Sequence, residues 1–120
     1  MLIAFPVGGD SQGESVIFEH FAAAPVFVTY DTSSEKYGQI LNEEATLSAG
    51  SKNASDLLTK AGVNVVVAAG IGDGAINRLN GLGIEVFWSH AGMVEYDLKL
   101  FLSGKLAGAT KGKCDGAFRQ

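Results

Sequence analysis

Cysteine, proline and long apolar runs are all scarce in this sequence, and each shortage excludes a class of protein. The single cysteine, Cys114, cannot form an internal disulfide, and no secretory signal precedes the first strand-like run. With two prolines and 47% hydrophobic residues, the chain of 120 residues is not of the disordered or linker-rich kind. Its longest apolar stretch, Val63 to Ile71, is broken by Asn64 and Gly70 and is too short to cross a membrane. We therefore expect a cytoplasmic protein with no role in a membrane.

Positive charge is also scarce. The formal net charge is −4 at pH 7, and residues 1–104 hold five basic and twelve acidic residues, whereas residues 105–120 hold four basic and one acidic. A protein that binds nucleic acid neutralises phosphates with Lys and Arg, so we expect no nucleic acid among the partners. The length fits one domain. We assign residues 1–104 to it and expect residues 105–120, which lose periodicity and gain small and basic side chains, to be a flexible C-terminal tail.

Apolar periodicity predicts an α/β fold with the element order β-β-β-α-β-α-β-α. The segments with the composition of strands are Leu2–Val7, Val26–Asp31, Tyr37–Leu41, Val63–Ala69 and Ile84–Trp88. Apolar residues at helical spacing predict three helices. The first follows the N-cap candidate Asn53 and stops at Gly62, the second begins at Ala75 and stops at Gly83, and the third spans Val94–Leu102. The second and third strands suit a hairpin and the later strands alternate with helices. A mixed five-stranded sheet is therefore expected.

A glycine-rich turn after the most apolar strand is the best candidate binding surface, because ligands of α/β sheets bind beyond the carboxyl ends of parallel strands. Gly70, Gly72 and Gly74 would let backbone N–H groups approach an anion, and the next helix would add the positive end of its dipole. However, the third glycine of a dinucleotide fingerprint would fall at Asn77, and no Gly-Lys-Ser/Thr follows as in a P-loop. The carboxylate of Asp73, at the start of the helix, would also compete with a bound anion for the positive end of the helix dipole. A tight turn with an Asp cap is therefore the alternative to an anion or cluster surface.

The two histidines are the candidate ligand groups. His20, followed by Phe21, lies between the first loop and the second strand, and His90 lies in the loop before the last helix. Each imidazole could bind a metal or transfer a proton, or could simply be exposed. Both could converge with the glycine turn, since all three lie on loops that flank strands of one sheet. Spacings typical of a zinc motif are absent, so Cys114 is either a third soft ligand or incidental.

The last predicted helix is apolar on two sides. One side, the predicted core stripe, consists of Val94, Leu98, Phe101 and Leu102. The second apolar side consists of Met93, Tyr96 and Leu100. Such a helix is either buried all round or a contact surface between copies of the chain. We expect a monomer or a weak homodimer.

Four segments, in their order and spacing, resemble one protein family. They are Leu2–Val7, Glu19–Phe27, Gly62–Val67 with Gly70–Gly72, and Gly83–Val86 with Phe101–Leu106. Together they look like the dinitrogenase iron-molybdenum cofactor biosynthesis family. The resemblance implies a ribonuclease H-like three-layer domain and a non-catalytic protein that binds or carries a metal–sulfur cluster, which could be iron–molybdenum cofactor-like, iron–sulfur or molybdenum-containing. It also implies proteins that donate or accept the cluster as partners.

The family's characteristic motif is a histidine followed by Phe-Gly-Arg, which carries over to His20 and Phe21. Ala22 and Ala23 stand where the family usually has glycine and arginine, so a cation that would help to hold an anionic cluster is missing. The predicted cofactor-binding residues are His20, Phe21, Gly70, Gly72, Asp73, Gly74 and His90. His20 is the predicted metal ligand, with His90 and Cys114 as further candidates.

The positions of the acidic residues argue against an enzyme. Ribonuclease H-like nucleases hold two metal ions with carboxylates on the first and fourth strands. Here Leu2–Val7 and Val63–Ala69 contain neither Asp nor Glu. The remaining paired carboxylates are expected on the solvated surface, namely Glu43 with Glu44 and Glu95 with Asp97. We expect no catalysis, and the alternative to a cluster carrier is a small-anion or nucleotide sensor at the glycine turn, or an adaptor that uses the last helix.

Overall fold

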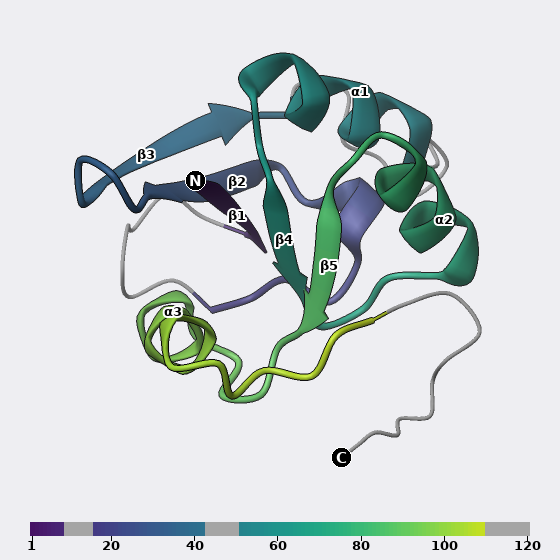
Figure 1. Cartoon of the computed structure of the whole chain (residues 1–120). Coiled ribbons are helices and arrows are strands. Elements are labelled where there is room, and N and C mark those ends of the chain that lie inside the picture. The colour runs from purple at the N-terminus through teal and green to yellow at the C-terminus, as the bar shows by residue number, and fades with distance from the viewer. Residues whose placement is uncertain (9–15, 43–50, 110–120) are drawn as a thin grey trace.

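Five strands form one mixed sheet in the order β3-β2-β1-β4-β5 (Figure 1). The computed structural model describes residues 1–8, 16–42 and 51–109. The strands are β1 (Leu2–Val7), β2 (Val26–Asp31), β3 (Lys36–Leu41), β4 (Val65–Ala68) and β5 (Glu85–Trp88). β2 runs antiparallel to both β1 and β3, whereas β4 runs parallel to both β1 and β5. The predicted α/β class and the mixed five-stranded sheet are confirmed.

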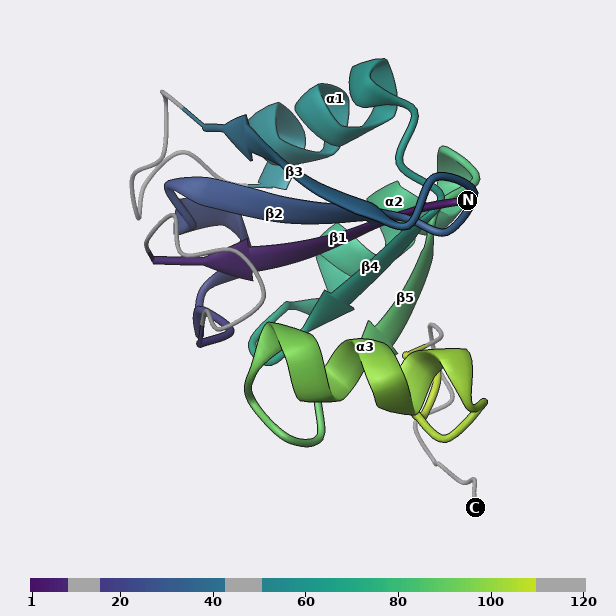
Figure 2. The ribbon, with the colours of Figure 1, turned by 90° about the vertical axis from the view of Figure 1, so that its left-hand side faces the viewer.

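Helices cover both faces of the sheet (Figure 2). Helices α1 (Ser51–Ala61) and α2 (Asp73–Gly81) pack on one face and α3 (Val94–Leu102) packs on the other. Successive residues of a strand point to opposite faces, so Ala4 joins the core under α1 and α2 while its neighbour Ile3 joins the core under α3. This two-sided burial explains why β1 and β4 are almost wholly apolar. Within the described residues, no helix has both the length and the apolar character needed to cross a membrane.

Two glycines end the helices that lead into the parallel strands. Gly62 follows α1 with a φ of 84°, and Gly83 lies just beyond α2 with a φ of 86°. Both values are in the left-handed region, which glycine adopts without a steric penalty and which commonly closes a helix. The predicted stops at these two residues therefore agree with the structure. Helix α1 begins at Ser51, ahead of the N-cap candidate Asn53.

The packed part of the chain extends past the boundary that the sequence predicts at residue 104. The N–H of Trp88 donates to the carbonyl of Ala107, and the N–H of Ala109 donates to the carbonyl of Val86, each at 2.8 Å. Leu106 and Ala109 are buried. Residues 107–109 therefore lie along the edge of β5, where Gly108 also forms a bridge with Phe87. The rest of the predicted tail, residues 110–120, lies outside the described residues.

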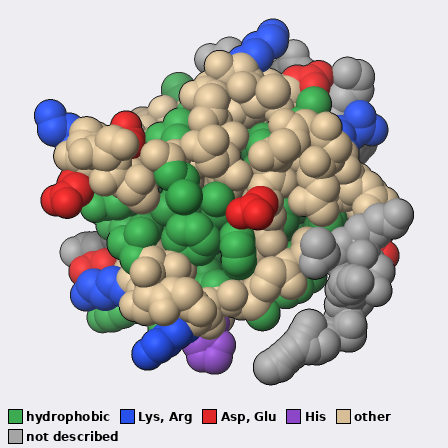
Figure 3. Space-filling view, in the orientation of Figure 1, with side chains coloured by type: hydrophobic (Ala, Val, Ile, Leu, Met, Phe, Trp, Pro, Cys, Tyr) green, Lys and Arg blue, Asp and Glu red, His purple; other side chains and the backbone are tan. Residues whose placement is uncertain are grey.

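Among the described residues, α3 is the one helix on the second face of the sheet, and it leaves part of that face open. Figure 3 shows hydrophobic side chains at the surface between α3 and the hairpin of β2 and β3. Two edge-to-face aromatic pairs pack against the hydrophobic core under α3. They are Tyr30 with Tyr37 and Phe87 with Phe101, each with ring centroids 5.0 Å apart. On α3 itself, Tyr96 is exposed. The apolar second side predicted for this helix is thus partly at the surface.

A buried carboxylate shapes the loop between β5 and α3. The side chain of Asp97, in α3, is fully buried. It accepts hydrogen bonds from the hydroxyl of Ser89 (2.5 Å) and from the backbone N–H groups of His90 (3.0 Å), Ala91 (2.7 Å) and Gly92 (3.2 Å). The expectation that Asp97 lies on the solvated surface is therefore wrong. Sequence spacing could not show that three successive N–H groups need an acceptor at this point.

Replacement of Asp97 by alanine should cost about 3 kcal/mol of unfolding free energy, because it leaves the N–H groups of His90 and Ala91 and the Ser89 hydroxyl without their acceptor. The N–H of Gly92 keeps only the Ser89 hydroxyl oxygen as acceptor. Urea denaturation of the purified variant measures this loss. The matched control is Glu95→Ala in the same helix, whose carboxylate is exposed and lies 3.8 Å from the Lys99 ammonium. Its loss should be below about 1 kcal/mol. Equal losses in the two variants would contradict the role assigned to Asp97.

Candidate functional site

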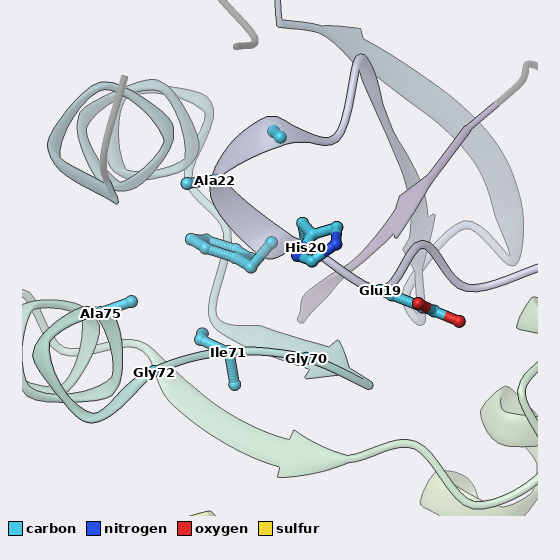
Figure 4. A pocket seen from close by; sticks show the side chains of 9 residues that line it. Glu19, His20, Ala22, Gly70, Ile71, Gly72 and Ala75 are labelled. Carbon is cyan, nitrogen blue, oxygen red and sulfur yellow. The ribbon is translucent and has the colours of Figure 1, made fainter. Parts of the chain in front are cut away.

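A hollow of about 580 Å³ lies beyond the carboxyl end of β4, between the short 3-10 helix η1 (Phe21–Ala23) and the turn that leads into α2 (Figure 4). Its lining residues come from these two segments, namely Glu19, His20, Phe21, Ala22, Ala23, Gly70, Ile71, Gly72 and Ala75. Most of the lining is apolar side chain or glycine backbone. The imidazole of His20 and the carboxylate of Glu19 are its polar side chains.

Backbone hydrogen bonds fix the segment that carries His20. The N–H of Phe18 donates to the carbonyl of Pro6 (2.7 Å), which ties the segment to β1. The N–H of Phe21 donates to the carbonyl of Gly70 (3.0 Å), which ties it to the turn after β4. His20 lies between these two anchors, so its position is set by the main chain. Its ring is exposed and meets the ring of Phe18 edge to face, with centroids 6.1 Å apart.

The three glycines of the turn differ in what requires them. A Cβ atom added at Gly70 would lie 1.7 Å from the carbonyl oxygen of Glu19, which is a severe clash with backbone. A Cβ atom added at Gly72 or Gly74 would meet nothing within 4 Å. Neither of these two residues has a positive φ. Gly70 is therefore required by the close approach of Glu19, whereas the fold makes no such demand at Gly72 or Gly74.

Helix α2 begins at the hollow. Gly72 is its N-cap, and the carbonyl of Gly72 accepts the first helical hydrogen bond, from the N–H of Ile76 (3.0 Å). The N–H groups ahead of Ile76 have no partner within the helix, and they belong to the end where the helix dipole is positive. Ala75 from this first turn lines the hollow. Asp73, in the same turn, contributes a carboxylate close to these donors.

The structure brings together some of the residues that the sequence predicts for the site and leaves others apart. His20, Phe21, Gly70 and Gly72 line the hollow, whereas Asp73 and Gly74 continue from it into α2 without lining it. His90 is exposed on the loop after β5 and is not among the lining residues. Cys114 lies outside the described residues. The predicted meeting of His20 with the glycine turn is observed, and the meeting of His90 with them is not.

Sequence reasoning did not single out three lining residues, Glu19, Ile71 and Ala75, and it noted Ala22 and Ala23 only as departures from the family motif. The first three side chains are apolar or acidic and belong to no known chemical motif. The signal for them is position, since each lies next to a residue that was singled out. No group of three or more His, Cys, Asp or Glu in the described part of the chain is arranged to hold a metal ion.

Substitution of Gly70 by alanine should destabilise the fold by at least about 3 kcal/mol, because the new methyl group must displace the backbone of Glu19. Gly72→Ala is the matched control and should change stability by less than about 1 kcal/mol. Gly74→Ala should be neutral or stabilising by up to about 1 kcal/mol, since alanine is the better helix former. Chemical denaturation compares the three variants. A Gly70→Ala protein as stable as the wild type would contradict the backbone crossing.

Comparison with known proteins supports a family assignment. The model of the dinitrogenase iron-molybdenum cofactor family matches residues 1–104. Among solved structures, the apo form of the orange protein from Desulfovibrio gigas is similar, with a TM-score of 0.83 and 26% identity over 92% of this chain and 93% of that one. A protein from Thermotoga, provisionally assigned as a NifB protein, is similar with a TM-score of 0.78 and 28% identity over 96% and 98% of the two chains.

A provisionally assigned dinitrogenase from Methanocaldococcus jannaschii shares the fold, with a TM-score of 0.67 and 19% identity over 92% of this chain and 96% of that one. No curated protein matches the sequence significantly. The family match spans most of the chain and includes every lining residue of the hollow. The resemblance found in the sequence is confirmed, and the chain belongs to the dinitrogenase iron-molybdenum cofactor family.

Proposed function

We propose that this protein is a non-catalytic carrier that binds a metal–sulfur cluster in the hollow beside His20. The observation that carries the proposal is the hydrogen bond from the N–H of Phe21 to the carbonyl of Gly70, which holds an exposed imidazole at an apolar hollow. Family membership supports it, because the family is defined by its relation to the iron–molybdenum cofactor. Exchange of the cluster with donor and acceptor proteins in the cytoplasm is part of the same proposal.

The chemistry of the lining suits a preassembled cluster better than a bare metal ion. A bare ion needs several protein ligands, and among the described residues that line the hollow only His20 and Glu19 have side chains of a metal-binding type. A cluster that carries its own sulfides and terminal ligands needs fewer. A volume of about 580 Å³ also exceeds what a single ion fills. His20 would supply one imidazole nitrogen to such a cluster, in the neutral form in which histidine binds metals.

The other lining residues would protect and orient the cargo. Phe21, Ile71 and Ala75 present apolar walls, which exclude water from the sulfides. The N–H groups at the start of α2, which have no partner within the helix, can donate hydrogen bonds to sulfide or oxo groups. The absence of side chains at Gly72 and Gly74, which the fold itself does not require, leaves these donors accessible.

The ribonuclease H-like assignment implied by the family belongs to the same proposal, and the mixed sheet with helices on both faces supports it. The carrier role is supported by the composition of β1 and β4. These strands contain no carboxylate for a pair of catalytic metal ions. An anion or nucleotide sensor is the alternative, and the accessible N–H groups of α2 are the observation that favours it. It predicts strong thermal stabilisation by a nucleotide and none by metal–sulfur species.

Anaerobic reconstitution with iron–sulfur clusters, followed by visible absorption, tests the carrier proposal. The wild type should acquire cluster absorption after desalting, and His20→Ala should bind the same cluster at least about tenfold more weakly. His90→Ala is the matched control, since it removes an exposed imidazole that is not part of the hollow, and it should bind like the wild type. Identical spectra for wild type and His20→Ala would count decisively against the proposed site.

A second test uses the accessible glycine. Gly72→Ala should keep the stability of the wild type but lower cluster affinity by about tenfold, because its methyl group stands between the cargo and the backbone donors. Titration of the folded variant with the cluster measures the affinity. Unchanged affinity would show that the cargo does not approach this part of the backbone.

A further inference from the structure

The fixed charges at the hollow are negative. Of the residues that line it in the described part of the chain, none is Lys or Arg, and Glu19 is the one carboxylate. Asp73 follows the lining residue Gly72 and adds a second carboxylate nearby. In Figure 4 the Glu19 side chain points away from His20 and from the side chains of Ile71 and Ala75, so its carboxylate acts on the hollow from outside and is not placed to share a ligand with the imidazole.

The start of α2 provides the opposing charge. A helix N-terminus acts like about half of a positive elementary charge. Asp73 places a full negative charge in the same turn. The walls formed by Phe21, Ile71 and Ala75 also make it costly to remove a charge from water, since they offer no compensating groups. A guest with several negative charges therefore meets no net attraction here.

We propose that the hollow selects its cargo by charge. It accepts metal–sulfur clusters whose own ligands leave little or no net negative charge, and it disfavours multiply charged anions such as tetrathiomolybdate. This inference rests on the proposed function and names the class of cargo for that site. Glu19 is the specificity-determining residue. Its backbone is held against Gly70 beside the neighbouring hydrogen bond of Phe21, which keeps its exposed carboxylate in the neighbourhood of the hollow.

The test varies the charge of the cargo while its core stays the same. Iron–sulfur clusters are prepared anaerobically with thiolate ligands that end in an ammonium, a hydroxyl or a carboxylate group, and tetrathiomolybdate serves as a compact dianion. Affinities are measured by titration at low and high salt. The wild type should bind the ammonium-bearing cluster most tightly and the carboxylate-bearing cluster least. Added salt should strengthen, not weaken, the binding of the anions, because it screens repulsion.

Variants locate the effect. Glu19→Gln should raise the affinity for tetrathiomolybdate about fourfold, the size expected for one carboxylate acting on a dianion across about 10 Å of water-like medium. Glu85→Gln makes the same change in net charge at the start of β5, away from the hollow, and should leave the affinity unchanged. Ala23→Arg adds a guanidinium to the lining and should raise that affinity by at least about tenfold, with binding that salt now weakens.

The outcomes separate this inference from the function on which it rests. His20-dependent binding with the same affinity for all three clusters, or with anion binding that salt weakens in the wild type, would overturn charge selection and leave the carrier function standing. Equal effects of Glu19→Gln and Glu85→Gln would overturn the role of Glu19. Failure of every cluster to bind would overturn both proposals. The Glu19→Gln comparison decides the matter even if Ala23→Arg does not fold.

Discussion

Where the chain passes from Glu19 to Phe21 it crosses the turn after β4 so closely that the turn has room for a hydrogen atom and for no larger group at Gly70. The crossing is secured by the hydrogen bond from the Phe21 N–H to the Gly70 carbonyl. It brings residues some fifty positions apart in sequence into one lining, and the imidazole of His20 is held at the hollow as a result. The site therefore depends on a main-chain contact more than on any side-chain interaction.

A second set of hydrogen bonds supports this crossing from the other side of the sheet. The buried carboxylate of Asp97 accepts the N–H of Gly92, and the carbonyl of Gly92 in turn accepts the N–H of Ile17 at 2.9 Å. Ile17 lies just ahead of the segment that carries His20 and pairs with Val7 at the end of β1. Helix α3 thus contributes to the site without reaching it. Its carboxylate fixes a loop, and that loop holds the chain that enters the crossing.

The parts of the structure that follow from local chemistry could be predicted, and those that follow from distant contacts could not. Apolar runs and glycine stops revealed the strands and the ends of α1 and α2, because each depends on residues close in sequence. The burial of Asp97 and the pairing of residues 107–109 with β5 depend on backbone groups elsewhere, and composition alone does not reveal them. For the same reason, the sequence identified Gly70 as a glycine of interest but did not show what requires it. Ligand approach and a tight turn were the two alternatives, and the structure adds the close approach of the Glu19 backbone.

The backbone contacts that form the hollow are thus independent of the side chains that line it. The crossing uses only peptide groups and the absence of a side chain at Gly70, so the lining residues can change without moving the site. In this chain, two lining residues differ from the family pattern. Ala22 and Ala23 stand where the family pattern has glycine and arginine, and Glu19 is, apart from His20, the one acidic or basic residue among the described residues that line the hollow. Under the proposed function, the shared fold supplies the hollow, and residues particular to this protein set the charge of the cargo that it accepts.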